Sequence, residues 1–136
     1  GGAFVGVILH PAFRSPGISH WGWTSSPEDG QRTQFRRIDA YLSDRPSEIV
    51  MNPGAVAGGD EPITTTTHHR PIGRYIESLA RAGFLIETIE EWASARTSEP
   101  GPKAEEENRA RAEFPMFLAF RARRSAQTLP EGGPTG

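Results

Sequence analysis

The chain has 136 residues, enough for one domain, and 35% of them are hydrophobic, which is close to the value for globular proteins. Its formal net charge of −2 excludes a general positive field for nucleic acid or an anionic membrane, and the absence of cysteine excludes disulfides and thiolate chemistry. No apolar run is long enough to span a membrane, and Gly1 leads into a strand-like run without the features of a signal peptide, so we expect a soluble, cytoplasmic protein.

The first predicted element is an apolar run near the start of the chain. Ala3 to Leu9, with the sequence AFVGVIL, is too short for a typical helix and is rich in Val, Ile and Phe. A continuous apolar run of this length is typical of a strand that is covered on both faces, as in a parallel sheet. We therefore predict a fully buried strand that ends before His10.

Residues 12–67 form a long excursion that glycines and prolines break into short pieces. Such long segments inside compact domains are usually functional lids or disordered. The pattern favours a short helix with one apolar face formed by Phe35, Ile38, Tyr41 and Leu42. It also favours short strands at Glu48 to Met51 and at Ile63 to Thr67.

A helix, a glycine and a strand follow in residues 68–92. Pro71 suits the first helical position, because its missing N–H has no partner there and its φ is already helical. Gly83 stands where a left-handed C-terminal cap is expected, and Phe84 to Ile89 has the composition of a strand that packs back with the helix on a sheet. Apolar residues at helical spacing predict one buried face of the helix, made of Ile72, Tyr75, Ile76, Leu79 and Ala80.

The last predicted strand follows a polar connector. Residues 94–113 are polar, and their second half favours one or two helical turns. Phe114 to Phe120 is the third strong apolar run, with Pro115 near its beginning, where a strand tolerates proline best. A parallel last strand would need a crossover, and the connector offers only a weak helix, so we predict an antiparallel pair. The polar, Gly- and Pro-rich composition of residues 125–136 predicts a disordered tail.

Three strings, together with the order of the elements, resemble the C-terminal half of class I S-adenosylmethionine-dependent methyltransferases of the small-molecule, type 11-like kind. They are GGAFVGVILHPAF at the start, HRPIGRYIESLARAGFLIETIEEW in the middle and EFPMFLAFRAR at the end. The resemblance implies an α/β fold with a partial Rossmann-like sheet, made of strands five to seven of the family, in which the last strand is antiparallel and lies between the other two. It covers residues 1–124, with residues 12–67 as a substrate-lid insertion, and leaves residues 125–136 as the tail.

The cofactor motifs of this family lie on its first strands, and none of them can be placed in this sequence. Gly58 and Gly59 follow PGAVA without the preceding buried strand and the following helix that a cofactor loop requires. The resemblance thus implies a fragment that acts on a small molecule and carries the substrate side but no cofactor-binding residues. S-adenosylmethionine is the cofactor that the resemblance implies. The alternative is a non-catalytic remnant or an interaction module that pairs with a cofactor-binding half on a second chain.

Candidate substrate-binding residues lie around the carboxyl end of the first strand, where ligands bind in open α/β sheets. There His10 either orients substrate and accepts a proton or is hydrogen-bonded for structure alone. Aromatic residues of the excursion either form a flat wall for substrate near His10 or anchor the excursion to the domain. These aromatic residues are Trp21, Trp23 and Tyr41.

The remaining candidate substrate-binding residues are basic residues before the helix and in the excursion. Arg70 either pairs with a substrate carboxylate or makes a structural contact at the helix start. Adjacent His68 and His69 would point to opposite faces of a strand, so we predict no metal site there. No catalytic residue is assigned. The full predicted substrate-binding set is His10, Arg14, Trp21, Trp23, Tyr41, His69 and Arg70.

Overall fold

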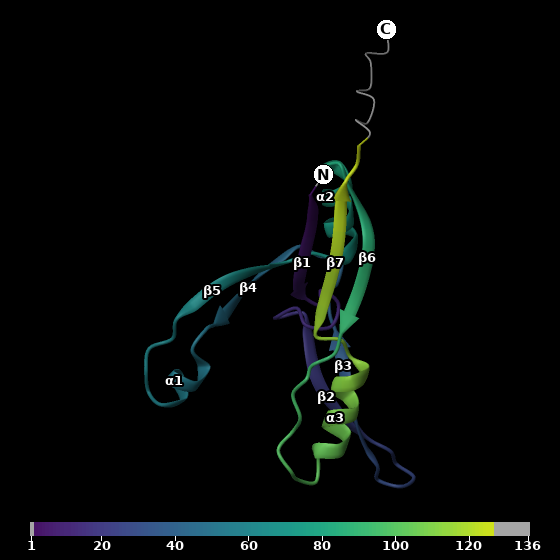
Figure 1. Ribbon diagram of the computed structural model, residues 1–136. Coiled ribbons are helices and arrows are strands. Elements are labelled where there is room, and N and C mark those ends of the chain that lie inside the picture. The colour runs from purple at the N-terminus through teal and green to yellow at the C-terminus, as the bar shows by residue number, and fades with distance from the viewer. Residues whose placement is uncertain (1, 127–136) are drawn as a thin grey trace.

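The computed structural model describes residues 2–126, which form three antiparallel β-structures and three helices (Figure 1). The main sheet contains β1 (Ala3–Leu9), β6 (Phe84–Trp92) and β7 (Phe117–Arg124). Two hairpins are formed by β2 (Ser19–Ser25) with β3 (Arg32–Ile38), and by β4 (Arg45–Val50) with β5 (Thr64–His69). The helices are α1 (Pro53–Ala57), α2 (Ile72–Arg81) and α3 (Ala104–Glu113).

The main sheet has the strand order β1–β7–β6, and β7 runs antiparallel to both of its neighbours. The prediction that the last strand lies between the other two is therefore confirmed. Leu118, Ala119 and Ala122 of β7 are buried, so the central strand carries much of the core of the described residues. Gly6 lies opposite Phe120, and a Cβ atom on Gly6 would lie only 2.4 Å from the Phe120 ring, so this glycine makes room for the ring.

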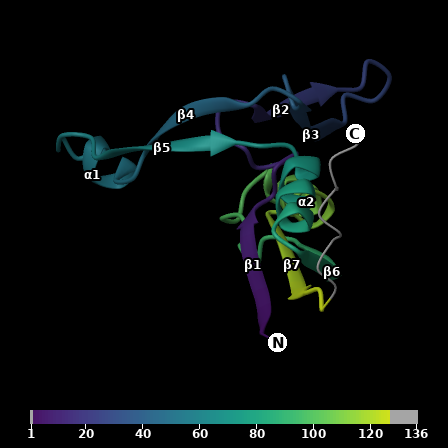
Figure 2. The same cartoon turned by 90° about the horizontal axis from the view of Figure 1, so that it is seen from above.

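Helix α2 covers one face of the main sheet, as the sequence predicts (Figure 2). Pro71 precedes the first helical residue instead of occupying that position, and its φ of −63° is already helical. Gly83 has a φ of +78°, which confirms the predicted left-handed position after the helix. The predicted buried face is only partly covered: no residue of α2 is fully buried, and both Ile76 and Ala80 are exposed. The residues of α2 that face the sheet are Ile72, Tyr75, Ile76 and Leu79, and they meet Ile86, Ile89, Leu118 and Phe120.

Strand β1 is not the fully buried strand of a parallel sheet that its composition predicts. Within the described residues its only strand partner is β7, which runs antiparallel, and Val5 and Val7 are 66% and 49% exposed. A strand that is apolar on both faces needs a layer on each face and a neighbour on each edge. Residues 2–126 supply one neighbour for β1, β7, and helix α2 packs mainly against β6, so the far edge of β1 and the face opposite α2 remain uncovered by these residues.

The excursion at residues 12–67 consists largely of hairpins. The helix predicted around Phe35 and Ile38 is wrong, because residues 32–38 form β3 and pair residue by residue with β2. Phe35 lies across from Gly22, and a Cβ atom on Gly22 would lie 2.4 Å from the Phe35 ring. This cross-strand contact favours the strand over the helix that the spacing of the apolar residues also allows. The short strands predicted near residues 48–51 and 63–67 are confirmed as β4 and β5.

The β4–β5 hairpin, with α1 at its tip, projects from the rest of the chain as an arm (Figures 1 and 2). Helix α1 has no buried residue, and β4 and β5 pair only with each other among the described strands. At the base of the arm, the Ser47 hydroxyl donates to the Pro16 carbonyl at 2.9 Å. A two-stranded hairpin is marginally stable alone, so the base contacts are what hold the arm to the domain.

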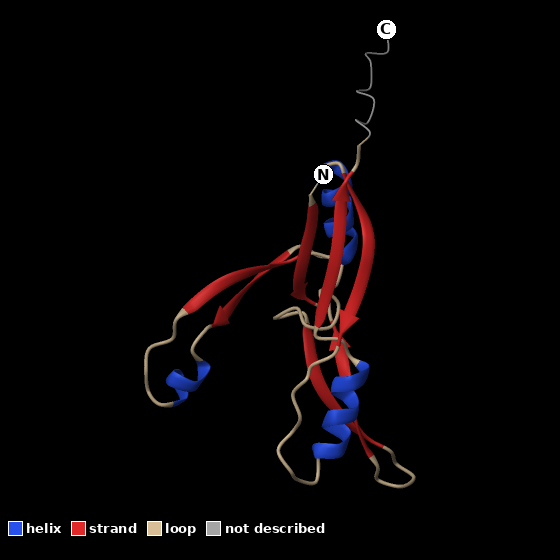
Figure 3. Cartoon of the chain, in the orientation of Figure 1, coloured by secondary structure: helices blue, strands red, loops and turns tan. Residues whose placement is uncertain are grey.

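Helix α3 is longer than the one or two turns that the sequence favours, and it packs against β3 (Figure 3). The backbone N–H of Gln34 donates to the Glu106 carboxylate at 2.7 Å, and the Gln34 carbonyl accepts from Arg109 at 3.0 Å. Arg109 also pairs with Glu106 at 2.7 Å. Glu106 and Arg109 therefore pair with the backbone N–H and carbonyl of Gln34 on the open edge of β3, and these bonds hold the connector at residues 93–113 against the excursion.

The described chain continues just beyond β7. The Ser125 N–H donates to the Gly83 carbonyl at 2.7 Å, whereas residues 127–136 of the predicted tail lie outside the described residues. No helix within residues 2–126 is long and apolar enough to cross a membrane.

A matched pair of glycine substitutions tests the cap after α2. Gly83→Ala should cost about 1 kcal/mol, because a side chain is disfavoured at its φ of +78°. Gly73→Ala should gain about 0.5 kcal/mol, because Gly73 lies inside the helix and a Cβ atom there meets nothing within 4 Å. Urea unfolding followed by circular dichroism measures both changes. Equal effects of the two substitutions would contradict the assigned cap.

Candidate substrate site

His10 lies directly after β1, and its ring is almost completely buried, with 1% exposed. The backbone N–H of Ala12 donates to Nδ1 of His10 at 3.2 Å, so Nδ1 is an acceptor. Nε2 therefore carries the proton in the neutral ring and donates to the Glu91 carboxylate at 2.7 Å. Both ring nitrogens are used, and His10 joins the end of β1 to the end of β6. This arrangement supports the structural interpretation of His10.

His69, the last residue of β5, is also buried, with 3% exposed. Its Nε2 lies 2.7 Å from the Tyr41 carbonyl, which can only accept, so Nε2 donates. In the neutral ring Nδ1 then accepts from the Ser15 hydroxyl at 2.7 Å. The Tyr41 hydroxyl accepts from the N–H of Ile72, the first residue of α2. His69 and Tyr41 thus hold together the loop after β1, the arm and the start of α2.

A cavity of about 250 Å³ lies beside His69, between the end of β1, the loop that follows it, the end of β5 and α2. We call it the β1-end cavity. It combines an apolar wall with hydroxyl, imidazole and guanidinium groups, which is the composition of a small-molecule site. Its lining residues are Ile8, Leu9, Pro11, Ser15, Pro16, Thr67, His68, His69, Arg70 and Tyr75.

Arg70 is the charged residue of the β1-end cavity. Its Nη1 donates to the His69 carbonyl at 2.8 Å, and its Nε lies 3.7 Å from the Asp44 carboxylate, which is 3.9 Å from Arg74. Burial raises the pKa of Tyr75, while the nearby Arg70 charge lowers it by a smaller amount. The contact with Asp44 supports a structural role for Arg70, although its position in the cavity wall also lets it meet a bound anion.

A second group of predicted residues lies on the other side of the loop after β1. The guanidinium carbons of Arg14 and Arg36 lie 4.9 and 4.7 Å from the centre of the Trp21 ring. Trp21 contacts Phe114 at 5.6 Å between ring centres, Phe114 contacts Phe13 at 5.8 Å, and Phe13 contacts His10 at 4.8 Å. Trp21 therefore reaches His10 only through two intervening phenylalanine rings.

Trp23 and Tyr41 do not join this row of rings. Trp23 lies against Arg32 at 4.9 Å and Lys103 at 5.7 Å, whereas the Tyr41 ring contacts His69 at 5.8 Å. The structure thus divides the predicted set. His69 and Arg70 line the β1-end cavity, Tyr41 supports His69, and His10 lies beside the cavity. Arg14 and Trp21 lie together elsewhere, and Trp23 is separate from both groups.

Three residues of these sites were not predicted from the sequence: Ser15, Tyr75 and Arg36. The sequence does hold one indication for Tyr75, because its hydroxyl is the one polar group on the predicted apolar face of the helix.

The Gly58–Gly59 pair does not have the setting of a cofactor loop. Gly59 has a φ of +101°, but Gly58 and Gly59 follow the five-residue helix α1 at the tip of the arm and precede strand β5, whereas a cofactor loop leads from a strand into a helix. Within residues 2–126, no three His, Asp or Glu side chains gather as a metal site would require. Neither a cofactor step nor a metal step can therefore be assigned to this part of the chain.

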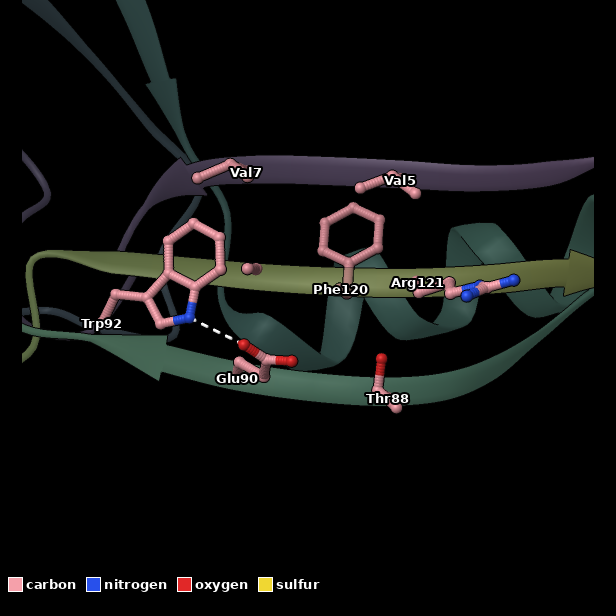
Figure 4. A pocket seen from close by; sticks show the side chains of 8 residues that line it. Val5, Val7, Thr88, Glu90, Trp92, Phe120 and Arg121 are labelled. Carbon is pink, nitrogen blue, oxygen red and sulfur yellow. Dashed lines mark hydrogen bonds between the residues drawn. The ribbon is translucent and has the colours of Figure 1, made fainter.

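An open hollow of about 340 Å³ lies on the main sheet, lined by residues of all three strands (Figure 4). The register places Val5, Arg121 and Thr88 side by side, and places Val7 beside Ala119 and Glu90. Trp92 lies across the hollow and donates from Nε1 to Glu90 at 2.8 Å. Because strand residues alternate between faces, this surface lies opposite the one that α2 covers.

The chain is similar in structure to two solved proteins. An S-adenosylmethionine-dependent methyltransferase from Mesorhizobium loti matches with 33% sequence identity and a TM-score of 0.53, over 91% of this chain and 49% of that chain. The chain is similar to S-adenosylmethionine-dependent methyltransferases. A provisionally assigned methyltransferase of the same kind from Listeria monocytogenes matches with 24% identity and a TM-score of 0.54, over 91% and 47% of the two chains, and supports the fold alone.

The chain spans about half the length of these methyltransferase structures. No protein-family model matches it, and no curated protein does. The similarity supports a relationship to the methyltransferase family.

A matched pair of histidine substitutions tests the structural role of His69. His69→Phe should cost about 2 to 3 kcal/mol, because it leaves the Ser15 hydroxyl and the Tyr41 carbonyl without their partner in a buried place. His68→Phe should change the free energy of unfolding by less than about 0.5 kcal/mol, because His68 is exposed. Urea unfolding measures both. Similar values for the two variants would show that the buried hydrogen bonds of His69 contribute little.

Proposed function

We propose that this chain is the substrate-side part of an S-adenosylmethionine-dependent methyltransferase that acts on a small molecule. The observation that carries the proposal is the match to the Mesorhizobium loti methyltransferase over 91% of this chain at 33% identity. The strand order β1–β7–β6, with β7 antiparallel, supports it because the sequence resemblance implies this order. The small-molecule substrate and a separate cofactor-carrying segment are the partners in this proposal, which places the protein in the cytoplasm.

The β1-end cavity is the proposed place for the acceptor molecule. Methyl transfer depends mainly on alignment of the acceptor with the methyl group in a site that excludes water. Leu9 and Pro11 supply apolar surface, while Ser15, Arg70 and Tyr75 supply groups that can orient a polar acceptor. His10 and His69 act as positioning residues in this proposal, because their ring nitrogens are already used by Glu91, Ala12, Ser15 and Tyr41.

The cofactor site is proposed to lie on a segment other than residues 1–136, in the same polypeptide or in a second chain. Two uncovered surfaces support this proposal. The far edge of β1 has no strand partner among residues 2–126, and the hollow opposite α2 exposes Val5, Val7 and Trp92 by 66%, 49% and 44%. A further strand on this edge and a helix layer on this face would bury apolar surface, which stabilises a fold by about 25 cal/mol for each Å² removed from water.

The second candidate function is a non-catalytic interaction module. The observation that favours it is the place of Gly58 and Gly59 at the tip of the arm, between helix α1 and strand β5. In that case the chain would still pair with a cofactor-binding half, but no methyl group would be transferred. Activity of the completed protein separates the two candidates.

Calorimetric titration with S-adenosylmethionine tests the division of roles. The chain alone should show no micromolar binding, because Gly58 and Gly59 lie between helix α1 and strand β5 and not between a strand and a helix. A chimera that joins this chain to the segment of the Mesorhizobium loti protein left unmatched by the alignment should bind the cofactor at micromolar concentration. Micromolar binding by this chain alone would contradict the proposal. A chimera that binds the cofactor but transfers no methyl group to any small molecule of a broad acceptor panel would favour the second candidate.

A further inference from the structure

Two arginines lie against one tryptophan beside the loop that follows β1. Arg14 and Arg36 approach the Trp21 ring at 4.9 and 4.7 Å, and all three side chains are half-buried. The face of an aromatic ring attracts a cation, which explains why each guanidinium rests there. It does not explain why two cations share one ring.

The hydrogen bonds of these arginines go to neutral oxygens. Arg14 donates from Nε and Nη2 to the carbonyls of Pro115 and Phe114. Arg36 donates from Nε to the Phe13 carbonyl at 2.6 Å, and from Nη2 to the carbonyl and the hydroxyl of Ser19. In both residues Nη1 makes no hydrogen bond within the part of the chain that the structure describes. Each side chain therefore keeps donors for a further acceptor.

A third guanidinium adds to this positive charge. Arg111 is half-buried and donates to the Ser98 hydroxyl and the Asn108 side-chain oxygen. Glu107 is connected to it through the same Ser98 hydroxyl, which donates to the Glu107 carboxylate at 2.5 Å. Within residues 2–126, no carboxylate lies within 4 Å of the guanidinium groups of Arg14, Arg36 or Arg111.

The other arginines of the described chain differ in one of two ways. Some are exposed to solvent, which screens an unpaired charge: Arg32, Arg45, Arg96 and Arg124. The rest have a carboxylate within 4 Å: Arg37, Arg70, Arg74, Arg81, Arg109, Arg121 and Arg123. Arg14, Arg36 and Arg111 alone among residues 2–126 are both shielded and without a carboxylate. Solvent screens a half-buried charge less than an exposed one, so a bound anion would stabilise these three arginines more than the others.

The electrostatics agree with the geometry. Burial, and after it the Arg111 charge, lowers the pKa of Arg14; burial, and after it the Arg14 charge, lowers the pKa of Arg36 to about 10. Arg36 remains protonated near neutral pH, because its pKa of about 10 is far above neutrality. The folded chain thus holds mutually repelling charges near one another, and an anion bound to their free donors would relieve the repulsion.

We propose that Arg14, Arg36 and Trp21 form a binding site for an oxyanion, a carboxylate or a phosphate, carried by a small molecule. Arginine guanidinium groups bind such planar or tetrahedral oxyanions with paired hydrogen bonds. The inference rests on the proposed function only in treating this molecule as a methyl acceptor. The row of rings from Trp21 through Phe114 and Phe13 to His10 connects the anion site with the end of β1.

Indole N–H signals in nuclear magnetic resonance spectra test the site without any cofactor. The chain has three tryptophans, Trp21, Trp23 and Trp92, and Trp21→Phe assigns the Trp21 signal. We titrate the full chain with benzoate, inorganic phosphate and neutral benzamide at constant ionic strength. The Trp21 signal should shift and saturate with benzoate or phosphate, and the one that binds more tightly identifies the oxyanion. Benzamide should not shift it, and neither oxyanion should shift the Trp92 signal.

Arginine variants supply the decisive comparison. Arg36→Gln and Arg111→Gln should each weaken the binding of the oxyanion about tenfold. Arg37→Gln, a neighbour in β3 whose exposed side chain pairs with Asp39, should leave it unchanged. Arg36→Gln also removes a hydrogen bond to the Phe13 carbonyl and could disturb the loop after β1. Arg111→Gln controls for this effect, because Arg111 makes no hydrogen bond to that loop. The oxyanion site would be overturned if the Trp21 signal showed no saturable shift, or if Arg37→Gln and Arg111→Gln weakened oxyanion binding equally; the methyltransferase proposal would be untouched.

A chimera that does not bind S-adenosylmethionine but still binds the oxyanion would overturn only the methyltransferase proposal.

Discussion

Strand β7 shares a hydrogen-bond ladder with β1 on one side and with β6 on the other, and this double pairing fixes the end of β1 from which the loop between the candidate sites begins. The end of β1, the end of β6 and the start of β7 meet at one edge of the sheet. There the His10 N–H donates to the Met116 carbonyl at 2.9 Å, and the Met116 N–H donates to the Trp92 carbonyl at 2.7 Å. The His10 ring adds its bond to Glu91, so the loop after β1 leaves the sheet from a defined point.

Two segments that are far apart in the sequence then build the candidate sites around this loop. On one side, the end of β5 and the start of α2 close the β1-end cavity through His69 and Tyr41. On the other side, the Trp21 ring and the charges of Arg14 and Arg36 face Phe114 at the end of the connector.

The strands of the main sheet and helix α2 could be predicted from the sequence because each is a local pattern: an apolar run, or an apolar stripe followed by Gly83. The structure of the excursion could not be predicted in this way, because β2 and β3 pair through cross-strand contacts such as Gly22 with Phe35. The site residues show the same limit. The place of His10 followed from the end of β1, but its partner Glu91 is 81 residues away in the sequence. Arg36 carried no signal, because only the hairpin brings it to the Trp21 ring.

Hydrogen–deuterium exchange of β1 amides is the most direct test of the central claim that this chain supplies part of a larger sheet. The exchange is measured for this chain alone and for the chimera that carries the unmatched segment of the Mesorhizobium loti protein. Amides of β1 that point away from β7 should exchange quickly in the chain alone and become strongly protected in the chimera, because a new strand would pair with this edge. Unchanged exchange at this edge of β1 in a folded chimera would contradict the account.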